Sequence, residues 1–165
     1  MVKHLISQQS YFTLKLLSAL GCGLVAGVFF AFSSFVMSAL GRLQPPEGIA
    51  AMQSINITVI NPGFMLTFMG TAALCVFLAI ASVLKWHQPG APYLLLGSLL
   101  YLIGTFLVTI VGNVPLNDAL AVVKPNSTEG AILWSRYLTN WTAWNHVRTI
   151  AALASAAVFS LTLRY

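Results

Sequence analysis

The stretch with the most chemical potential is residues 140–149, which reads NWTAWNHVRT and precedes the almost wholly apolar IAALASAAVFSLTL. On a helix, Trp141, Asn145 and Arg148 share one face because they are spaced i, i+4 and i+7. His146 lies about 100° round the helix from Asn145 and can titrate near neutral pH without help from its surroundings. These residues predict a pocket with an indole wall, a polar floor and a proton-carrying group at its edge.

Further polar side chains come from residues 112–120, which read GNVPLNDAL and end another apolar run. This segment supplies Asn113, Asn117 and Asp118. Because Asp118 is the carboxylate near the end of that run, we expect it to form an ion pair with Arg148. We expect Pro115 to turn the chain there, because proline cannot continue a helical hydrogen-bond ladder.

The depth of Arg148 in a membrane follows from its distance to Arg164. These two positions are sixteen residues apart, which corresponds to roughly 24 Å at about 1.5 Å per residue, whereas a hydrocarbon core is about 30 Å thick. A charge below the boundary normally faces the protein interior. The alternative is that Arg148 extends to the interface, with Trp141 and Trp144 as membrane anchors and the asparagines as helix caps.

The composition identifies the environment that must surround these residues. The chain of 165 residues is 58% hydrophobic and 7% charged, with a mean hydropathy of +0.86. A water-soluble domain needs more surface charge, so the lipid bilayer is the expected partner. The net charge of +5 is spread thinly along the chain, which argues against a nucleic-acid partner. Cys22 and Cys75 lie within apolar runs and are interpreted as structural.

Four apolar stretches are long enough to cross a bilayer. They predict an all-α fold, a polytopic membrane four-helix bundle forming a single domain over residues 1–165. We expect short interfacial helices in the first connection, PPEGIAAMQSINITVINP, and in the third, STEGAILWSRYL. The predicted spans cover about residues 12–40, 62–84, 92–112 and 141–163.

The positions of the positive charges, the small residues and the histidines predict the orientation of the chain, the packing of its first span and the kind of site it can form. The distribution of lysine and arginine, with Lys3 and Lys85 on the side of both termini, favours cytoplasmic N- and C-termini, in the inner membrane if the source is bacterial. Ala19, Gly23 and Gly27 recur every fourth residue, which predicts close packing of the first span against another helix. The histidines are divided between the two membrane faces, which argues against a metal centre.

Four motifs resemble the anthrone oxygenase family, small four-helix membrane proteins long described as a domain of unknown function. They are LSALGCGLVAGVFFAFSSFVM, IAAMQSINITVINPGFM, GNVPLNDAL and WTAWNHVRT, and they are distributed over nearly the whole chain. The resemblance implies a monooxygenase that converts anthrones to anthraquinones with dioxygen and without a metal or flavin cofactor. It also implies a lipophilic phenolic or polycyclic substrate.

The same resemblance assigns roles to the polar residues. His146, or Asp118 with a pKa raised by burial, would be the base. Arg148 with Asn113 or Asn145 would hold the developing oxyanion. The remaining substrate contacts would come from Asn117, Trp141 and Trp144. The alternative is a non-catalytic membrane module that binds a small molecule, assists a transporter or assembles with a partner, in which the polar residues only hold helices together.

Overall fold

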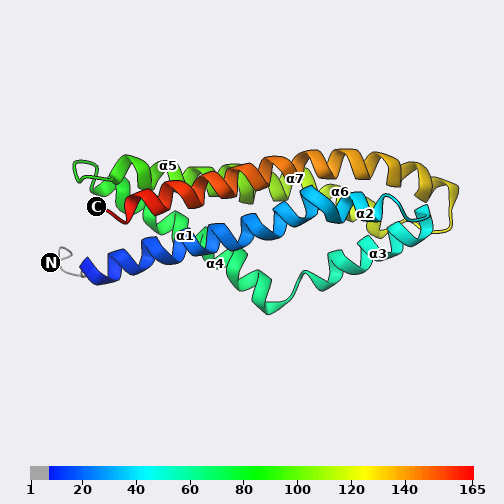
Figure 1. Ribbon diagram of the computed structural model, residues 1–165, viewed down its shortest axis with the longest axis horizontal. Coiled ribbons are helices and arrows are strands. Elements are labelled where there is room, and N and C mark those ends of the chain that lie inside the picture. Colours follow the sequence, from blue (N-terminus) through cyan, green and yellow to red (C-terminus); the bar gives the residue numbers. More distant parts are fainter. Residues whose placement is uncertain (1–7) are drawn as a thin grey trace.

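The computed structural model describes residues 8–165 and is helical throughout its regular structure, which confirms the all-α fold class. Figure 1 shows long helices side by side, with the C-terminus at the same end of the molecule as the start of α1. In chain order the elements are α1 (Gln8–Ala31), the π-helical η1 (Phe32–Val36), α2 (Met37–Leu40), α3 (Pro45–Thr58), α4 (Pro62–Leu84), α5 (Ala91–Tyr101), the π-helical η2 (Leu102–Leu107) and η3 (Thr109–Asn113), α6 (Val114–Ala121) and α7 (Thr128–Thr162).

Several of these elements join into rods that are longer than a bilayer is thick. Within residues 8–165, three helices are long and apolar enough to cross a membrane: Gln9–Leu40, Pro62–Leu84 and Ala91–Ala121. The 35 residues of α7 add a fourth rod of about 50 Å, whose apolar half follows Arg148. In the bundle, α7 contacts both α1 and α5, and α4 contacts the same two helices. The protein is therefore a helical membrane protein of four-helix-bundle type.

The rods pack around two separate cores. The membrane core lies among α1, α4, α5 and α7, and it comprises Ala19, Cys22, Val25, Phe29, Phe68, Ala72, Cys75, Leu78, Leu94, Tyr101 and Phe159. Beyond it, α3 folds back against α2, α6 and the first half of α7 (Figure 1). The buried side chains of this headpiece form the headpiece core: Met37, Leu40, Ile49, Met52, Leu120, Trp134, Tyr137 and Trp141.

The third connection differs from the sequence-based expectation of a separate short helix. Residues 128–162 form one helix, which begins where the Ser127 hydroxyl accepts a hydrogen bond from the Gly130 N–H at 2.9 Å. The reason is that this stretch contains no proline, and no glycine after Gly130, so nothing interrupts the ladder. In the first connection, α3 is a separate helix.

Pro115 does not turn the chain, which corrects the second local expectation. The helix runs on through η3 into α6, and Pro115 occupies one of the first positions of α6. A π-helical turn has wider i→i+5 spacing, and a proline at a helix start lacks only an N–H that is unpaired there anyway. The helix that begins at Ala91 therefore continues past Pro115 and places Asn113 and Asn117 next to Trp141 of the headpiece core.

The small-residue stripe of α1 is only partly used for packing. Ala19 is buried, but Gly23 and Gly27 are exposed, and a Cβ added at either would meet no atom within 4 Å. The close helix approach occurs elsewhere, at Gly104, where an added Cβ would lie 2.5 Å from the Ala151 Cβ. Lys3, used for the orientation, lies outside the described residues.

Candidate functional site

Arg148 lies inside the bundle with only 4% of its surface exposed. Its Nη2 donates a hydrogen bond to the Asn145 Oδ1 at 2.6 Å, and its Nη1 donates to the Thr109 hydroxyl at 3.3 Å. The guanidinium carbon lies 4.1 Å from the ring centroid of Phe29 and 5.1 Å from that of Trp141. Such aromatic faces attract a cation, and more strongly where water is excluded.

Arg148 lies level with the N-terminal third of α4. The Phe29 ring contacts both the guanidinium and Phe68, whose ring centroid is 6.4 Å away. Phe68 follows Pro62 by six residues, which is about 9 Å along the helix. Arg148 therefore lies about two helical turns from the N-terminal end of α4, and its depth in a membrane stays a prediction.

The expected ion pair between Arg148 and Asp118 is not formed. Asp118 is exposed, and within residues 8–165 Arg148 has no carboxylate partner. The continuation of the helix past Pro115 explains the difference. Asp118 follows Asn113 by five residues and therefore lies about 140° round the helix from it, on the outer face of α6.

Asn145 is the centre of the hydrogen-bond network and is fully buried. Its Nδ2 donates to the Phe29 carbonyl and to the Ser33 hydroxyl, each at 2.7 Å, while its Oδ1 accepts from Arg148. The Ser33 hydroxyl also contacts the Thr149 hydroxyl at 3.3 Å. Asn145 thus ties α1 to α7 and fixes the orientation of the guanidinium.

Asn113 and Asn117 are both directed at Trp141. The Asn113 Nδ2 donates to the Trp141 carbonyl at 3.1 Å. The Asn117 Oδ1 accepts two hydrogen bonds, one from the Trp141 Nε1 and one from the Tyr137 hydroxyl, both at 2.8 Å. Burial raises the pKa of Tyr137, so its hydroxyl remains a donor at neutral pH. These contacts lock the indole ring against the guanidinium.

Two buried polar atoms of this cluster have no hydrogen-bond partner. They are the Nε of Arg148 and the Oδ1 of Asn113. One is a donor and the other an acceptor, and both residues contact Trp141. Buried polar groups are rarely left unpaired, so these two atoms are the hydrogen-bonding groups of the cluster that the protein itself does not satisfy.

The other predicted site residues lie outside the cluster. His146 is exposed, and Trp144 is 42% exposed on the outer side of α7. Trp144 covers Gly112, where an added Cβ would lie 2.7 Å from the indole. The structure therefore brings together Asn113, Asn117, Trp141, Asn145 and Arg148, and it leaves Asp118, Trp144 and His146 outside.

Sequence reasoning missed the remaining members of the cluster, which are Phe29, Ser33, Thr109, Tyr137 and Thr149. The signal in the sequence that could have indicated one of them is the spacing of the threonines in the third span. Thr105 and Thr109 are four residues apart in an otherwise apolar span, and their hydroxyls bond to the carbonyls of Arg148, at 3.3 Å, and Thr105, at 2.8 Å. Neither the four-residue spacing of the threonines nor their apolar surroundings identify which residue of α7 they face.

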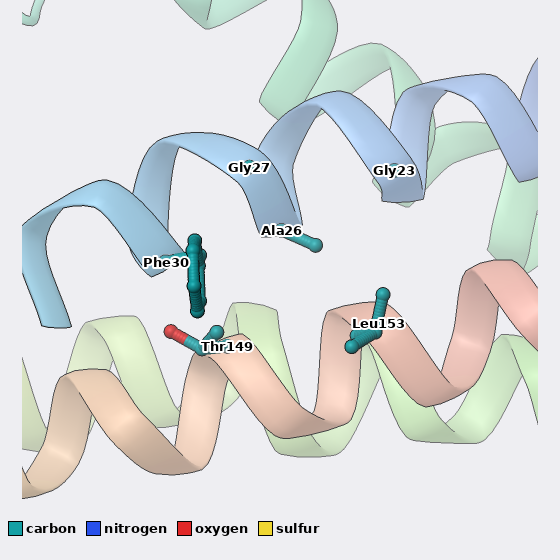
Figure 2. Close-up of a pocket in the computed structure, with 6 residues that line it drawn as sticks. All are labelled: Gly23, Ala26, Gly27, Phe30, Thr149 and Leu153. Carbon is teal, nitrogen blue, oxygen red and sulfur yellow. The ribbon is translucent and has the colours of Figure 1, made fainter. Parts of the chain in front are cut away.

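An apolar groove adjoins the polar cluster on the outer side of α1 and α7. Figure 2 shows Phe30 of α1 pointing toward Thr149 of α7 across this space. Its volume is about 300 Å³, at the lower end of the range for small-molecule sites. The Thr149 hydroxyl donates to the Asn145 carbonyl at 2.8 Å, so Thr149 belongs both to the lining of the groove and to the network around Arg148. The lining residues are Gly23, Ala26, Gly27, Phe30, Thr149 and Leu153.

Comparison with known proteins gives one match. No curated protein and no solved structure is similar to this chain at a significant level. In the part of the chain that the structure describes, no three histidine, cysteine or acidic side chains gather into a metal-binding group. The family model described as anthrone oxygenase matches residues 64–158, which is more than half of the chain and includes the whole contribution of the third rod and α7 to the polar cluster. The chain belongs to the anthrone oxygenase family.

Proposed function

We propose that the protein is a cofactor-independent oxygenase that oxidises a lipophilic phenolic or polycyclic compound with dioxygen inside the membrane. The observation that carries this proposal is the guanidinium of Arg148, which is buried without a carboxylate partner and flanked by the rings of Phe29 and Trp141. A buried positive charge between flat apolar surfaces is suited to an aromatic compound that develops negative charge on oxygen.

The reaction needs no metal or flavin in this proposal. An anthrone loses a proton from the methylene carbon that lies across the central ring from its carbonyl, and the resulting enolate transfers one electron to dioxygen. The radical pair combines into a peroxide anion, which takes a proton from water; the hydroperoxide then loses water and leaves the quinone. Arg148 supplies the charge that stabilises the enolate, and Asn145, whose Oδ1 already accepts from Arg148, acts as a positioning residue.

His146 and Asp118, the bases expected from the sequence, have a different role in this proposal. His146 and Asp118 are exposed, so they are proposed to carry the proton onward to water rather than to contact the reacting atoms. Trp144 is proposed to close the outer side of the site, because it covers Gly112. Asn113 and Asn117 are proposed to hold the wall formed by Trp141.

The membrane arrangement is part of the proposal. Four crossings, with both termini in the cytoplasm, would follow from the three apolar helices together with α7. The lipophilic substrate would then enter from the bilayer through the groove between α1 and α7, where Gly23 and Gly27 leave open space. Dioxygen, which is more soluble in lipid than in water, would reach the site by the same route.

The test uses purified full-length protein in detergent micelles with emodin anthrone as the substrate. Oxygen consumption should exceed the spontaneous rate in empty micelles, and Arg148→Gln should remove most of the excess. Arg136→Gln is the matched control, because Arg136 is an exposed arginine of the same helix. A wild-type rate equal to that of empty micelles would contradict the proposed function.

A second function is favoured by a different set of contacts. Several polar side chains bond to carbonyls of neighbouring helices, as Asn145 does to Phe29 and Thr105 does to Arg148. In a non-catalytic membrane module, these contacts would only join helices. Arg148→Gln would then lower the melting temperature in detergent, and no anthrone-like compound would raise that of the wild-type protein.

A further inference from the structure

Two lysines from different helices meet at the end of the bundle that holds the start of α1 and the end of α7 (Figure 1). The Lys15 Nζ donates a hydrogen bond to the Thr162 carbonyl at 3.2 Å, which joins α1 to the last turn of α7. The centroid of the Tyr11 ring is 5.0 Å from the Lys15 Nζ and 4.9 Å from the Lys85 Nζ. Lys85 directly follows α4. We call Tyr11, Lys15 and Lys85 the lysine cluster.

The two positive charges of the lysine cluster are not balanced by an acidic side chain. Because both Nζ atoms lie near one ring centroid, they are within about 10 Å of each other, a separation at which like charges still repel at ordinary ionic strength. The chain has three acidic side chains, and all of them belong to the headpiece. They are Glu47 in α3, Asp118 in α6 and Glu129 in the first turn of α7. The lysine cluster is therefore suited to binding an anion.

The two lysines differ in burial, and this difference indicates where the anion would lie. Lys15 is buried and Lys85 is exposed. A buried charge is costly unless an opposite charge lies nearby, and the contacts of Lys15 in the cluster are a carbonyl and an aromatic ring. An anion that contacts the exposed Lys85 would also lie in the field of Lys15. Phosphate is the anion that lysine commonly binds as a point charge.

The surface around the lysine cluster has the features of a membrane interface. Trp86, Tyr93 and Tyr165 are exposed there, and the rings of the two tyrosines are stacked with their centroids 6.1 Å apart. Tryptophan and tyrosine concentrate at the level of lipid headgroups. Exposed apolar side chains, Phe12 and Leu84, come from the same two helices as the lysines. A lipid brings both a phosphate and acyl chains for this apolar surface, whereas a soluble phosphate brings no acyl chain.

We propose that the lysine cluster binds the phosphate of an anionic membrane lipid, with the phosphate in contact with Lys85 and its charge opposing that of the buried Lys15. A phosphodiester with an uncharged headgroup, as in phosphatidylglycerol, has a net negative charge that two lysines attract. A phosphatidylcholine headgroup carries its own cation and has no net charge. The bound lipid would hold the start of α1 to the end of α4. This site is separate from Arg148 and does not depend on the proposed oxidation.

The experiment is a lipid titration of the full-length protein in micelles, with bound lipid counted by native mass spectrometry. Phosphatidylglycerol and phosphatidylcholine with the same acyl chains are compared, and we expect the wild-type protein to retain phosphatidylglycerol at lower lipid concentrations. Lys85→Gln should weaken the binding of phosphatidylglycerol about fivefold, the effect of losing one lysine contact with an anionic lipid surface. Lys85→Arg should retain most of the binding because it keeps the charge.

Two controls distinguish the lysine cluster from other sources of charge. Lys124→Gln removes an exposed lysine between α6 and α7 and should leave the binding of phosphatidylglycerol unchanged. Inorganic phosphate at the concentration of the lipid should not displace phosphatidylglycerol, because it has no acyl chains.

Three outcomes would overturn the inference. In the wild-type protein, equal retention of the two lipids would show that the negative charge is not recognised. Equal binding of phosphatidylglycerol by Lys85→Gln and Lys124→Gln would place the lipid elsewhere. Displacement of the lipid by an equal concentration of inorganic phosphate would assign the lysine cluster to a soluble anion. The first outcome needs no variant, so the test does not depend on whether a substituted protein folds.

Discussion

The membrane core and the headpiece core are built from different side chains. The membrane core combines small residues with phenylalanine, and its helices approach closely, as at Gly21, where an added Cβ would collide with the Thr71 hydroxyl. The headpiece core is organised around Trp134, Tyr137 and Trp141, whose successive ring centroids are 5.6 and 6.1 Å apart. The two cores also differ in how they use polar groups.

The difference is the one expected if the membrane core lies in lipid and the headpiece lies in water. Within lipid, helices gain little from burying apolar surface, so close packing and hydrogen bonds between helices stabilise the fold. Ser155 shows this, because its hydroxyl donates to the Gly97 carbonyl at 2.7 Å. A headpiece surrounded by water gains from burying large aromatic rings. Arg148 lies where the two regimes meet, between Phe29 of one core and Trp141 of the other.

The largest expected effect comes from replacing Arg148, which lies between the two cores. Arg148→Gln should lower kcat for anthrone oxidation by about 100-fold or more, the usual effect of removing a group that stabilises an oxyanion. Arg148→Lys should restore part of the activity. Oxygen-electrode rates at saturating substrate provide the measurement, and a folded Arg148→Gln protein with wild-type kcat would show that the charge only holds helices together.

The contrast between the cores can be measured with one large-to-small substitution in each. Trp134→Ala should destabilise the headpiece by about 3 kcal/mol or more, because a buried tryptophan is lost to a cavity next to water-exposed helices. Phe159→Ala in the membrane core should cost less, since part of the lost contact is shared with lipid in the unfolded reference state. Reversible denaturation in mixed micelles measures both. Equal losses would argue against the distinction drawn between the two cores.

A smaller effect is expected from the polar bridge of the headpiece. Asn117→Leu leaves the Tyr137 hydroxyl and the Trp141 Nε1 without their common acceptor, which should cost about 1–3 kcal/mol. Tyr137→Phe is the matched comparison, because it removes one donor and leaves the other hydrogen bond in place. We expect its cost to be about 1 kcal/mol, measured by the same denaturation. A Tyr137→Phe loss as large as that of Asn117→Leu would show that packing outweighs the hydrogen bonds.

The sequence predicted the helical bundle more fully than the site. Apolar run length alone identifies a helix such as Pro62–Leu84, because in lipid every backbone group must be paired internally. The grouping of Trp141, Asn145 and Arg148 on one face also follows from helical periodicity. The hydrogen-bond partners of Arg148 could not be predicted in the same way. They depend on the π-helical turns before Pro115, which change the helical spacing, and Asp118 therefore faces outward. Local composition does not encode that change in spacing.

The smallest expected effect concerns the groove between α1 and α7, which lies outside both cores. Gly27→Leu should leave the melting temperature nearly unchanged, because a Cβ there meets no atom within 4 Å. If the substrate reaches Arg148 by way of this groove, the added side chain should raise KM several-fold and leave kcat unaffected, since no transition-state contact is removed. Gly104→Leu provides the contrast, because its Cβ would collide with Ala151 and should impair folding. A Gly27→Leu protein with unchanged KM would place the entry route elsewhere. A wild-type protein that is dimeric in micelles and a Gly27→Leu protein that is monomeric would instead assign the groove to a second copy of the chain.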